Sequence, residues 1–195
     1  MNRLLRGKCL AWLALLCLGC APAAEVVDDT PPPTRVSTDF ARLPELLEGI
    51  TGSGQVVLYE GLPSPFWEPQ LRDQELNSAD TRLVQGHRVY DTPQDPSAAD
   101  GPKLTEILSS SQSYAPLVSG SPKTCGEFNV EFCIEFTHGS KITQVLICLE
   151  CGEVLLFGPA GELHCRLSPE SLKLLPPLLK PYEQGEKGEN PYSKN

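Results

Sequence analysis

The chain has 195 residues, of which 40% are apolar and 21% are charged, so it can build one hydrophobic core of ordinary domain size. Its 25 Asp and Glu residues outnumber its 16 Lys and Arg residues, which gives a formal net charge of −9. Phosphate backbones and anionic lipid surfaces both require a basic protein surface, so this balance argues against nucleic acid as a partner and against peripheral lipid binding.

The first 20 residues have the three-part pattern of an export signal. A basic stretch, MNRLLRGK, precedes the apolar run CLAWLALLCL, which Gly19 and Cys20 close. As a helix this run would extend about 15 Å, about half of a hydrocarbon core, so it is too short for a permanent membrane span. We therefore expect residues 1–19 to be a signal peptide and the protein to be exported.

The segment LCLGC resembles a bacterial lipobox, the processing signal of lipoproteins. This resemblance implies that Cys20 carries a diacylglycerol anchor with acyl chains such as palmitate, and that the membrane is a partner through this anchor. Cys17 stands where most lipoboxes have leucine, and a rival cleavage after Ala23 would leave no lipid. In the resembling class, Ala21 after the modified cysteine favours the outer membrane of the cell envelope, facing the periplasm or the surface.

Three regions follow the leader. Residues 20–38 are small, acidic and proline-rich, which predicts a flexible tether. Residues 39–182 show the apolar periodicity of a single domain. Residues 183–195 are polar and predict a disordered tail.

The first half of the domain mixes helical and strand patterns. In chain order we expect a helix, a strand, a second strand and a second helix at residues 39–49, 56–59, 83–91 and 102–109. The loop LPSPFWEP follows the first strand, and we expect Phe66 and Trp67 to anchor it to the core. Glu60, at the end of that strand, is expected to be an exposed carboxylate.

The clearest pattern lies between residues 127 and 167, where apolar residues alternate with polar ones as in a half-buried strand. We expect four strands at 128–136, 141–149, 153–157 and 162–167, with His138-Gly139 and Pro159-Ala160-Gly161 as turns. Ser168 caps a last helix, which Pro176-Pro177 should kink or split. The predicted class is α+β: an antiparallel β-meander of four to six strands with two or three short helices packed on one face.

Five cysteines follow Cys20, at positions 125, 133, 148, 151 and 165. In an oxidising compartment a structural disulfide is the default. With His138-Gly139 as the turn, Cys133 would face Gln144 and Cys148 would face Asn129, about 13 Å apart along the strand, too far for a bridge.

Cys125 would lie at the end of the first meander strand, beside the connection from 148 to 152. We therefore expect a Cys125–Cys151 disulfide, with Cys148 as the alternative partner of Cys125. Cys165 lies within the last strand and is expected to be a buried thiol.

Two further interpretations of the CxxC segment remain open. A zinc site would use Cys125, Cys148, Cys151 and Cys165, with His164 as a substitute for Cys165. A thiol-redox site would use Cys125, Cys148 and Cys151. Gly152 excludes haem attachment, which requires CxxCH.

The motifs LYEGLP, CGEF, CLEC and GPAGEL, over about residues 55–182, resemble a family of uncharacterised bacterial envelope proteins that carry LYEGLP, CGxF, CxxC and GxxGEL. The resemblance implies the domain extent and singles out Cys125, Cys148 and Cys151, but it implies no activity. Members often have His after CxxC, where this chain has Gly152.

No catalytic constellation accompanies His87, His138 and His164 in the sequence. We therefore expect a lipid-anchored envelope protein that is a binding or structural module, stabilised by a disulfide, with no catalytic residues, resident metal or cofactor. The sequence does not specify its protein or ligand partner.

Overall fold

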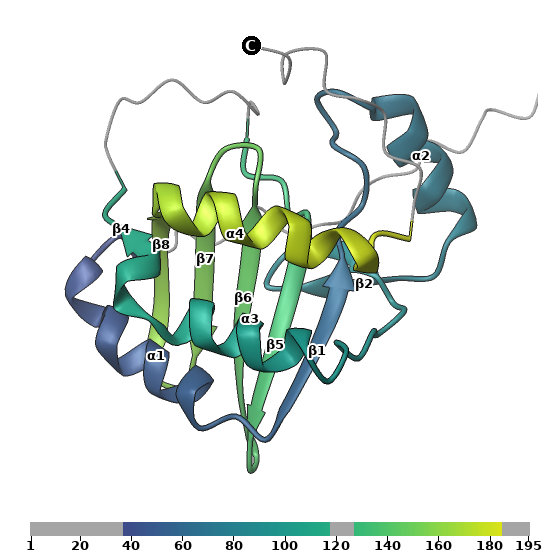
Figure 1. Ribbon diagram of the computed structural model, residues 1–195. Helices are drawn as coiled ribbons and strands as arrows, with labels where there is room; N and C mark the ends of the chain where they lie inside the picture. The colour runs from purple at the N-terminus through teal and green to yellow at the C-terminus, as the bar shows by residue number, and fades with distance from the viewer. Residues whose placement is uncertain (1–36, 118–126, 185–195) are drawn as a thin grey trace, which may run out of the picture.

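The computed structural model describes residues 37–117 and 127–184, and Figure 1 shows their arrangement. Its helices are α1 (Leu43–Thr51), α2 (Pro69–Ser78), α3 (Asp100–Ser109) and α4 (Pro169–Leu179), with short 3-10 turns η1 (Phe40–Arg42), η2 (Ser111–Ser113) and η3 (Lys180–Tyr182). Its strands are β1 (Gln55–Glu60), β2 (Thr81–Val84), β3 (His87–Tyr90), β4 (Tyr114–Ala115), β5 (Phe132–His138), β6 (Lys141–Cys148), β7 (Glu153–Gly158) and β8 (Gly161–Leu167). Within the described residues, no helix has the length and apolarity that a membrane span requires.

The main sheet has six antiparallel strands in the order β1-β5-β6-β7-β8-β4. The meander β5 to β8 forms its centre, and β1 and β4 form its edges. Helices α1, α3 and α4 lie together across one face (Figure 1). This arrangement confirms the predicted α+β class.

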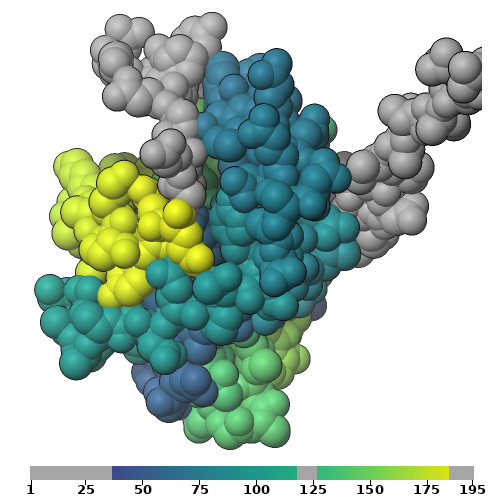
Figure 2. Space-filling view, turned by 90° about the vertical axis from the view of Figure 1, so that its right-hand side faces the viewer, coloured from purple at the N-terminus to yellow at the C-terminus, as the bar shows by residue number. Residues whose placement is uncertain are grey.

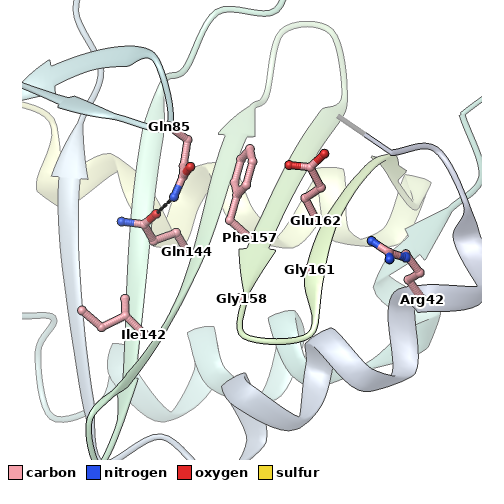
Figure 3. Close-up of a pocket in the computed structure, with 8 residues that line it drawn as sticks. All are labelled: Arg42, Gln85, Ile142, Gln144, Phe157, Gly158, Gly161 and Glu162. Carbon is pink, nitrogen blue, oxygen red and sulfur yellow. Dashed lines mark hydrogen bonds between the residues drawn. The ribbon is translucent and has the colours of Figure 1, made fainter. Parts of the chain in front are cut away.

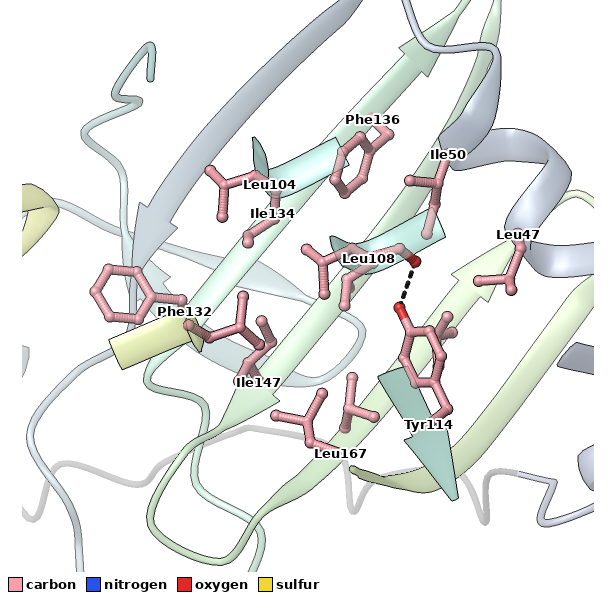
Figure 4. Close-up of a cluster of buried hydrophobic side chains, with 14 of the residues drawn as sticks. Leu47, Ile50, Leu104, Leu108, Tyr114, Phe132, Ile134, Phe136, Ile147 and Leu167 are labelled. Carbon is pink, nitrogen blue, oxygen red and sulfur yellow. Dashed lines mark hydrogen bonds between the residues drawn. The ribbon is translucent and has the colours of Figure 1, made fainter. Parts of the chain in front are cut away.

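The core lies between the sheet and these three helices (Figure 4). Alternate residues of β5, namely Phe132, Ile134 and Phe136, point toward the helices and are at most 1% exposed. Ile50 of α1 and Leu108 of α3 close over them. Each such side chain contributes about 1.5–3 kcal/mol by leaving water, so this face carries most of the stability of the fold.

The opposite face of the sheet has a smaller cluster of its own, in which Cys133 of β5 and Leu146 of β6 pack against Val84 and Val89. These two valines belong to the β2–β3 hairpin, a separate two-stranded sheet. Its turn places Gln85 at φ +52 and Gly86 at φ +82, the backbone of a tight type I′ turn. The hairpin therefore covers the β1, β5 and β6 side of this face.

The C-terminal turn is fastened to the segment that leads into α3. The hydroxyl of Tyr182 donates to Asp100 Oδ2 at 2.8 Å and accepts from the Ser97 backbone N–H at 2.8 Å. Figure 2 shows the yellow C-terminal segment against this teal segment. These hydrogen bonds thus hold the C-terminal turn against the start of α3.

The first predicted turn of the meander was placed one residue before its true position, and the second, Pro159-Ala160-Gly161, was one residue too long. The observed turns are Gly139-Ser140 and Pro159-Ala160, because His138 pairs with Lys141 and Gly158 with Gly161. Gly139 has φ +62, a conformation that glycine adopts without strain. Moving a turn by one residue shifts the register by two, so Cys133 faces Leu146 instead of Gln144.

Other local predictions also need correction. Residues 83–91 are not one strand, because Gln85-Gly86 turns the chain between β2 and β3. The short strand β4 and helix α2 were not predicted, and α2 buries none of its residues. Pro176 and Pro177 do not split the last helix, since α4 continues through both to Leu179.

The prediction for the aromatic pair after β1 also needs correction. Phe66 is 58% exposed and therefore does not anchor its loop to the core. Its ring contacts that of Trp67 edge-on, with centroids 4.5 Å apart. Trp67 is the more buried of the two.

Candidate functional site

A groove of about 560 Å³ lies on the face of the sheet opposite the helices (Figure 3). It is lined by Arg42, Gln85, Ile142, Gln144, Phe157, Gly158, Gly161 and Glu162. Its size is within the range of small-ligand sites in proteins. The lining residues come from η1, the β2–β3 turn, β6, β7 and β8, so only the tertiary fold brings them together.

The floor of the groove is apolar. Phe157 of β7 is half-buried, and Ile142 of β6 is 49% exposed, which is high for a residue of this type. Residues two apart on a strand share a face, so Ile142 and Gln144 both point into the groove from β6 (Figure 3). A ligand with an apolar group would bury this exposed surface.

A row of hydrogen bonds fixes the polar side of the groove. Gln85 Nε2 donates to Gln144 Oε1, and Gln144 Nε2 donates to Glu135 Oε1, both at 2.7 Å. Arg82 Nη2 also donates to Glu135 Oε1 at 2.7 Å, and its guanidinium lies 4.3 Å from the centre of the Tyr59 ring. The Gln144 amide is therefore held in one orientation before any ligand arrives.

The backbone of Gln85 is strained. Among the described residues, Gln85 is the one non-glycine residue that has a positive φ. Such a conformation costs about 1–2 kcal/mol for an L-residue and persists where surrounding contacts impose it. Its side-chain amide retains an oxygen and a second N–H that can face a ligand.

Two opposite charges lie at the far end of the groove. The Arg42 guanidinium points from η1 toward β8 (Figure 3), where its Nη1 lies 2.6 Å from the point that a Cβ at Gly161 would occupy. Glu162 stands beside Phe157, its partner across the β7–β8 ladder. Neither Arg42 nor Glu162 forms an ion pair with another described residue, so both charges are available to a ligand.

Further along the same face, His164 of β8 interacts with Glu153 of β7, with Nε2 and Oε2 3.0 Å apart. Glu153 is 6% exposed, so this is a buried carboxylate next to an imidazole. The ring of Phe128 contacts those of both His164 and His87 edge-on. Burial, followed by the charge of Arg72, lowers the pKa of His87.

These histidines are therefore part of a packed layer, which their sequence context did not indicate. Strand alternation could have indicated this arrangement. Positions 153 and 155 of one strand and 164 of the next lie on the same face of the sheet once the turn is placed correctly. The pair fixes Phe128 over the sheet beyond the groove.

The predicted cysteine site is partly within the described residues. Cys148 ends β6, and Cys151 lies in the turn before β7, where its backbone N–H is 3.4 Å from Cys148 Sγ. Cys20 and Cys125 lie outside the described residues, so the lipid anchor and the Cys125–Cys151 bridge remain predictions. No disulfide joins two of the described cysteines.

Cys165 is not placed with the CxxC segment. It belongs to the core on the helical face, whereas Cys148 lies on the other face, two strands away. The zinc set that included Cys165 is therefore not assembled. Within residues 37–117 and 127–184 no group of three or more His, Cys, Asp or Glu side chains is placed to hold a metal ion.

Cys133 and Cys165 are free, fully buried thiols. Burial raises the pKa of Cys165 from 9.0 to about 12. Burial, followed by the charge of Glu135, raises the pKa of Cys133 as well. Neither has the properties of a reactive cysteine, which needs an accessible thiolate.

Glu60 is buried, not exposed as predicted, with an exposed fraction of 0%. Its Oε2 accepts a hydrogen bond from the Gln184 backbone N–H. The carboxylate therefore ties the end of β1 to the C-terminal segment, 124 positions away in sequence. Sequence spacing contains no signal for such a contact.

Comparison of the chain with protein-family models, with curated proteins and with solved structures gave no match. Its function must therefore be inferred from the groove.

Proposed function

We propose that this protein is a lipid-anchored binding module of the bacterial cell envelope and that the groove in Figure 3 is its binding site. The observation that carries the proposal is the convergence of unpaired charge and ordered amides around an apolar floor. In binding sites, a few oriented polar groups beside apolar surface fix the orientation of a ligand.

The lining indicates the kind of ligand. Arg42 presents a guanidinium, which suits a carboxylate. Gln85 and Gln144 offer amide donors and acceptors, and Phe157 and Ile142 offer apolar surface. A peptide end with a carboxylate and an apolar last side chain matches all three features, and we propose this class of ligand.

The binding test uses the tripeptide acetyl-Ala-Ala-Phe with a free carboxylate, titrated into the ¹⁵N-labelled protein. We expect NMR shift changes at residues 142–144 and 157–162. Replacing the carboxylate by an amide, or Arg42 by Gln, should each weaken binding by about tenfold to a hundredfold, because a hydrogen bond to a charged group contributes about 1.5–3 kcal/mol.

Arg166→Gln is the matched control. Arg166 lies on the same face of β8 as Glu162, but it does not line the groove. Equal binding of the acid and amide peptides, or shifts that avoid the groove, would reject the peptide-end proposal.

The anchor is proposed from the leader alone, on its resemblance to a lipobox. Mass spectrometry of the membrane-extracted protein tests it independently of binding. An N-terminal Cys20 with an acyl mass is the expected result, and an unmodified N-terminus at Ala24 would refute it.

A further inference from the structure

The edge strand β1 has an open stretch of backbone near its beginning. The hydrogen bond from the Gly61 N–H to the Glu131 carbonyl, 2.8 Å long, continues the register of the β1–β5 ladder. Bonded pairs alternate along an antiparallel ladder, so the odd-numbered residues of β1 bond to β5. Val56 and Leu58 therefore present their backbone N–H and C=O groups away from the sheet.

This edge already accepts one residue from another segment of the chain. Leu58 donates to the Gln94 carbonyl and Gln94 donates to the Leu58 carbonyl, both at 2.9 Å, as in an antiparallel ladder. In the same register Pro96 would come opposite Val56, but proline has no N–H to donate, and the chain then turns into α3. No described residue therefore pairs with the outward backbone groups of Val56.

A second groove, of about 700 Å³, lies beside this open stretch, and we call it the edge groove. It is lined by the end of α1, the first residues of β1, residues 95–98 and α3, and it shares no lining residue with the groove in Figure 3. Ser53 lines it, and the Ser53 hydroxyl is shielded from water without a hydrogen-bond partner among the described residues. Such a hydroxyl is destabilising until a ligand or a water molecule supplies a partner.

The charged side chains that line the edge groove are both acidic. They are Asp95, before α3, and Glu106, on α3, and both are exposed. Neither forms an ion pair with another described residue. The whole chain carries a formal net charge of −9, so a second copy would bring more negative charge to this surface. A positively charged occupant complements it instead.

The register also determines where the side chain of an added strand would point. Residues directly opposite each other on two strands point to the same face of a sheet. Val56 packs against the core on the helical face, so a residue paired with Val56 would point its side chain to that face as well. Glu106 lines the edge groove from α3, on the same side. A lysine or arginine opposite Val56 would therefore bring its charge toward Glu106.

We propose that the edge groove binds an extended, basic peptide segment of another protein, which adds to β1 as a short antiparallel strand. The peptide residue opposite Val56 is a lysine or arginine, and it exchanges two backbone hydrogen bonds with Val56. In this mode of recognition, main-chain hydrogen bonds give affinity and side-chain contacts give specificity. The site needs neither a peptide end nor Arg42, so it is independent of the peptide-end site proposed above.

The test uses the pentapeptide acetyl-Thr-Val-Lys-Val-Thr-amide, whose blocked ends cannot supply the carboxylate proposed for the groove in Figure 3. Titrated into the ¹⁵N-labelled full chain, it should shift NMR signals at residues 53–56, 95–98 and 105–109, and leave those of the first groove unchanged. At saturation the Val56 amide should exchange with solvent about tenfold more slowly or less, because its N–H then donates to the peptide.

Two backbone-methylated peptides separate strand addition from charge attraction. Methylating the lysine N–H removes the donor that faces Val56 and should abolish detectable binding. Methylating the N–H of the following valine, which faces away from β1, should change binding less than about twofold.

Variants of the protein test the charge. Glu106→Gln should weaken binding about threefold, the size expected for one exposed ion pair. Glu170→Gln is the matched control and should leave binding unchanged, because Glu170 is an exposed carboxylate of α4 that does not line the edge groove.

The proposal is wrong if the two methylated peptides bind equally, if acetyl-Thr-Val-Glu-Val-Thr-amide binds as tightly as the lysine peptide, or if no signal of the edge groove shifts. Sedimentation of the free protein should show a monomer. A dimer in which the Val56 amide is already protected would assign this edge to a second copy, and that result would also overturn the proposal.

Discussion

The phenolic hydroxyl of Tyr114 donates a 2.6 Å hydrogen bond to the carbonyl oxygen of Leu108 (Figure 4). Leu108 lies in the last turn of α3, where carbonyls have no partner within the helix. Both residues are buried. A residue of strand β4 thus provides the hydrogen-bond donor for a carbonyl at the end of α3, in a buried place that water does not reach.

Tyr114→Phe should therefore lower the free energy of unfolding by about 1–2 kcal/mol, because it leaves the Leu108 carbonyl buried without this donor. Urea denaturation at pH 7 measures the loss. A variant as stable as the wild type would show that another group satisfies this carbonyl.

The same variant should respond less to alkaline pH. Burial raises the pKa of Tyr114 well above its ordinary value of 10.0, and Cys165 adds to the shift. Its contribution to stability is complete below pH 10 and is lost as pH rises further, since the unfolded chain then ionises first. Unfolding free energies at pH 10 and 11 should fall less steeply for Tyr114→Phe than for the wild type.

The Cys165 thiol should make the stability of the protein depend on pH as well, beginning at a lower pH than the Tyr114 hydroxyl does. Its pKa rises from 9.0 to about 12 on burial, so its contribution is present below pH 9 and disappears between pH 9 and 12. In this window it should remove about 1.4 kcal/mol per pH unit. Under reducing conditions, the free energy of unfolding of Cys165→Ala should therefore fall less steeply between pH 9 and 10 than that of the wild type. An unchanged slope would contradict the raised pKa of Cys165.

Gly161 should be needed for the groove as well as for the β7–β8 turn. It has φ +122, and a Cβ there would lie 2.6 Å from Arg42 Nη1. Gly161→Ala should cost about 1–2 kcal/mol in backbone strain and displace Arg42, which weakens binding of the acidic tripeptide. Gly139→Ala, at φ +62 with nothing within 4 Å, is the matched control: it should lose stability and keep binding.

Gly61 should tolerate no side chain. An added Cβ would lie 1.6 Å from the Val130 carbonyl oxygen, and the Gly61 N–H is already bonded to Glu131 O at 2.8 Å. Gly61→Ala should therefore cost about 3 kcal/mol or more and reduce the yield of folded protein. At Gly54 the nearest atom is 4.0 Å away, so Gly54→Ala should cost less than about 1 kcal/mol; equal losses would contradict this explanation.

The alternation from Phe132 to Phe136 was sufficient to predict the meander, because every second residue of a half-buried strand must be apolar. The same reasoning missed the β2–β3 turn, since Gln-Gly is an unusual sequence for a type I′ backbone. It also placed the turn after β5 one residue early, at His138-Gly139, because hydrophobic alternation marks strands more sharply than it marks the residues between them.

The amino-acid sequence alone determined the α+β class, the strand faces and the grouping of Cys148 with Cys151, because these depend on spacing along the chain. Tertiary structure decided the groove, in which Arg42, Gln85 and Phe157 meet from distant elements. It also buried Glu60 and separated Cys165 from the CxxC turn. Strand order and register set those relations, and both follow from the packing of the whole chain.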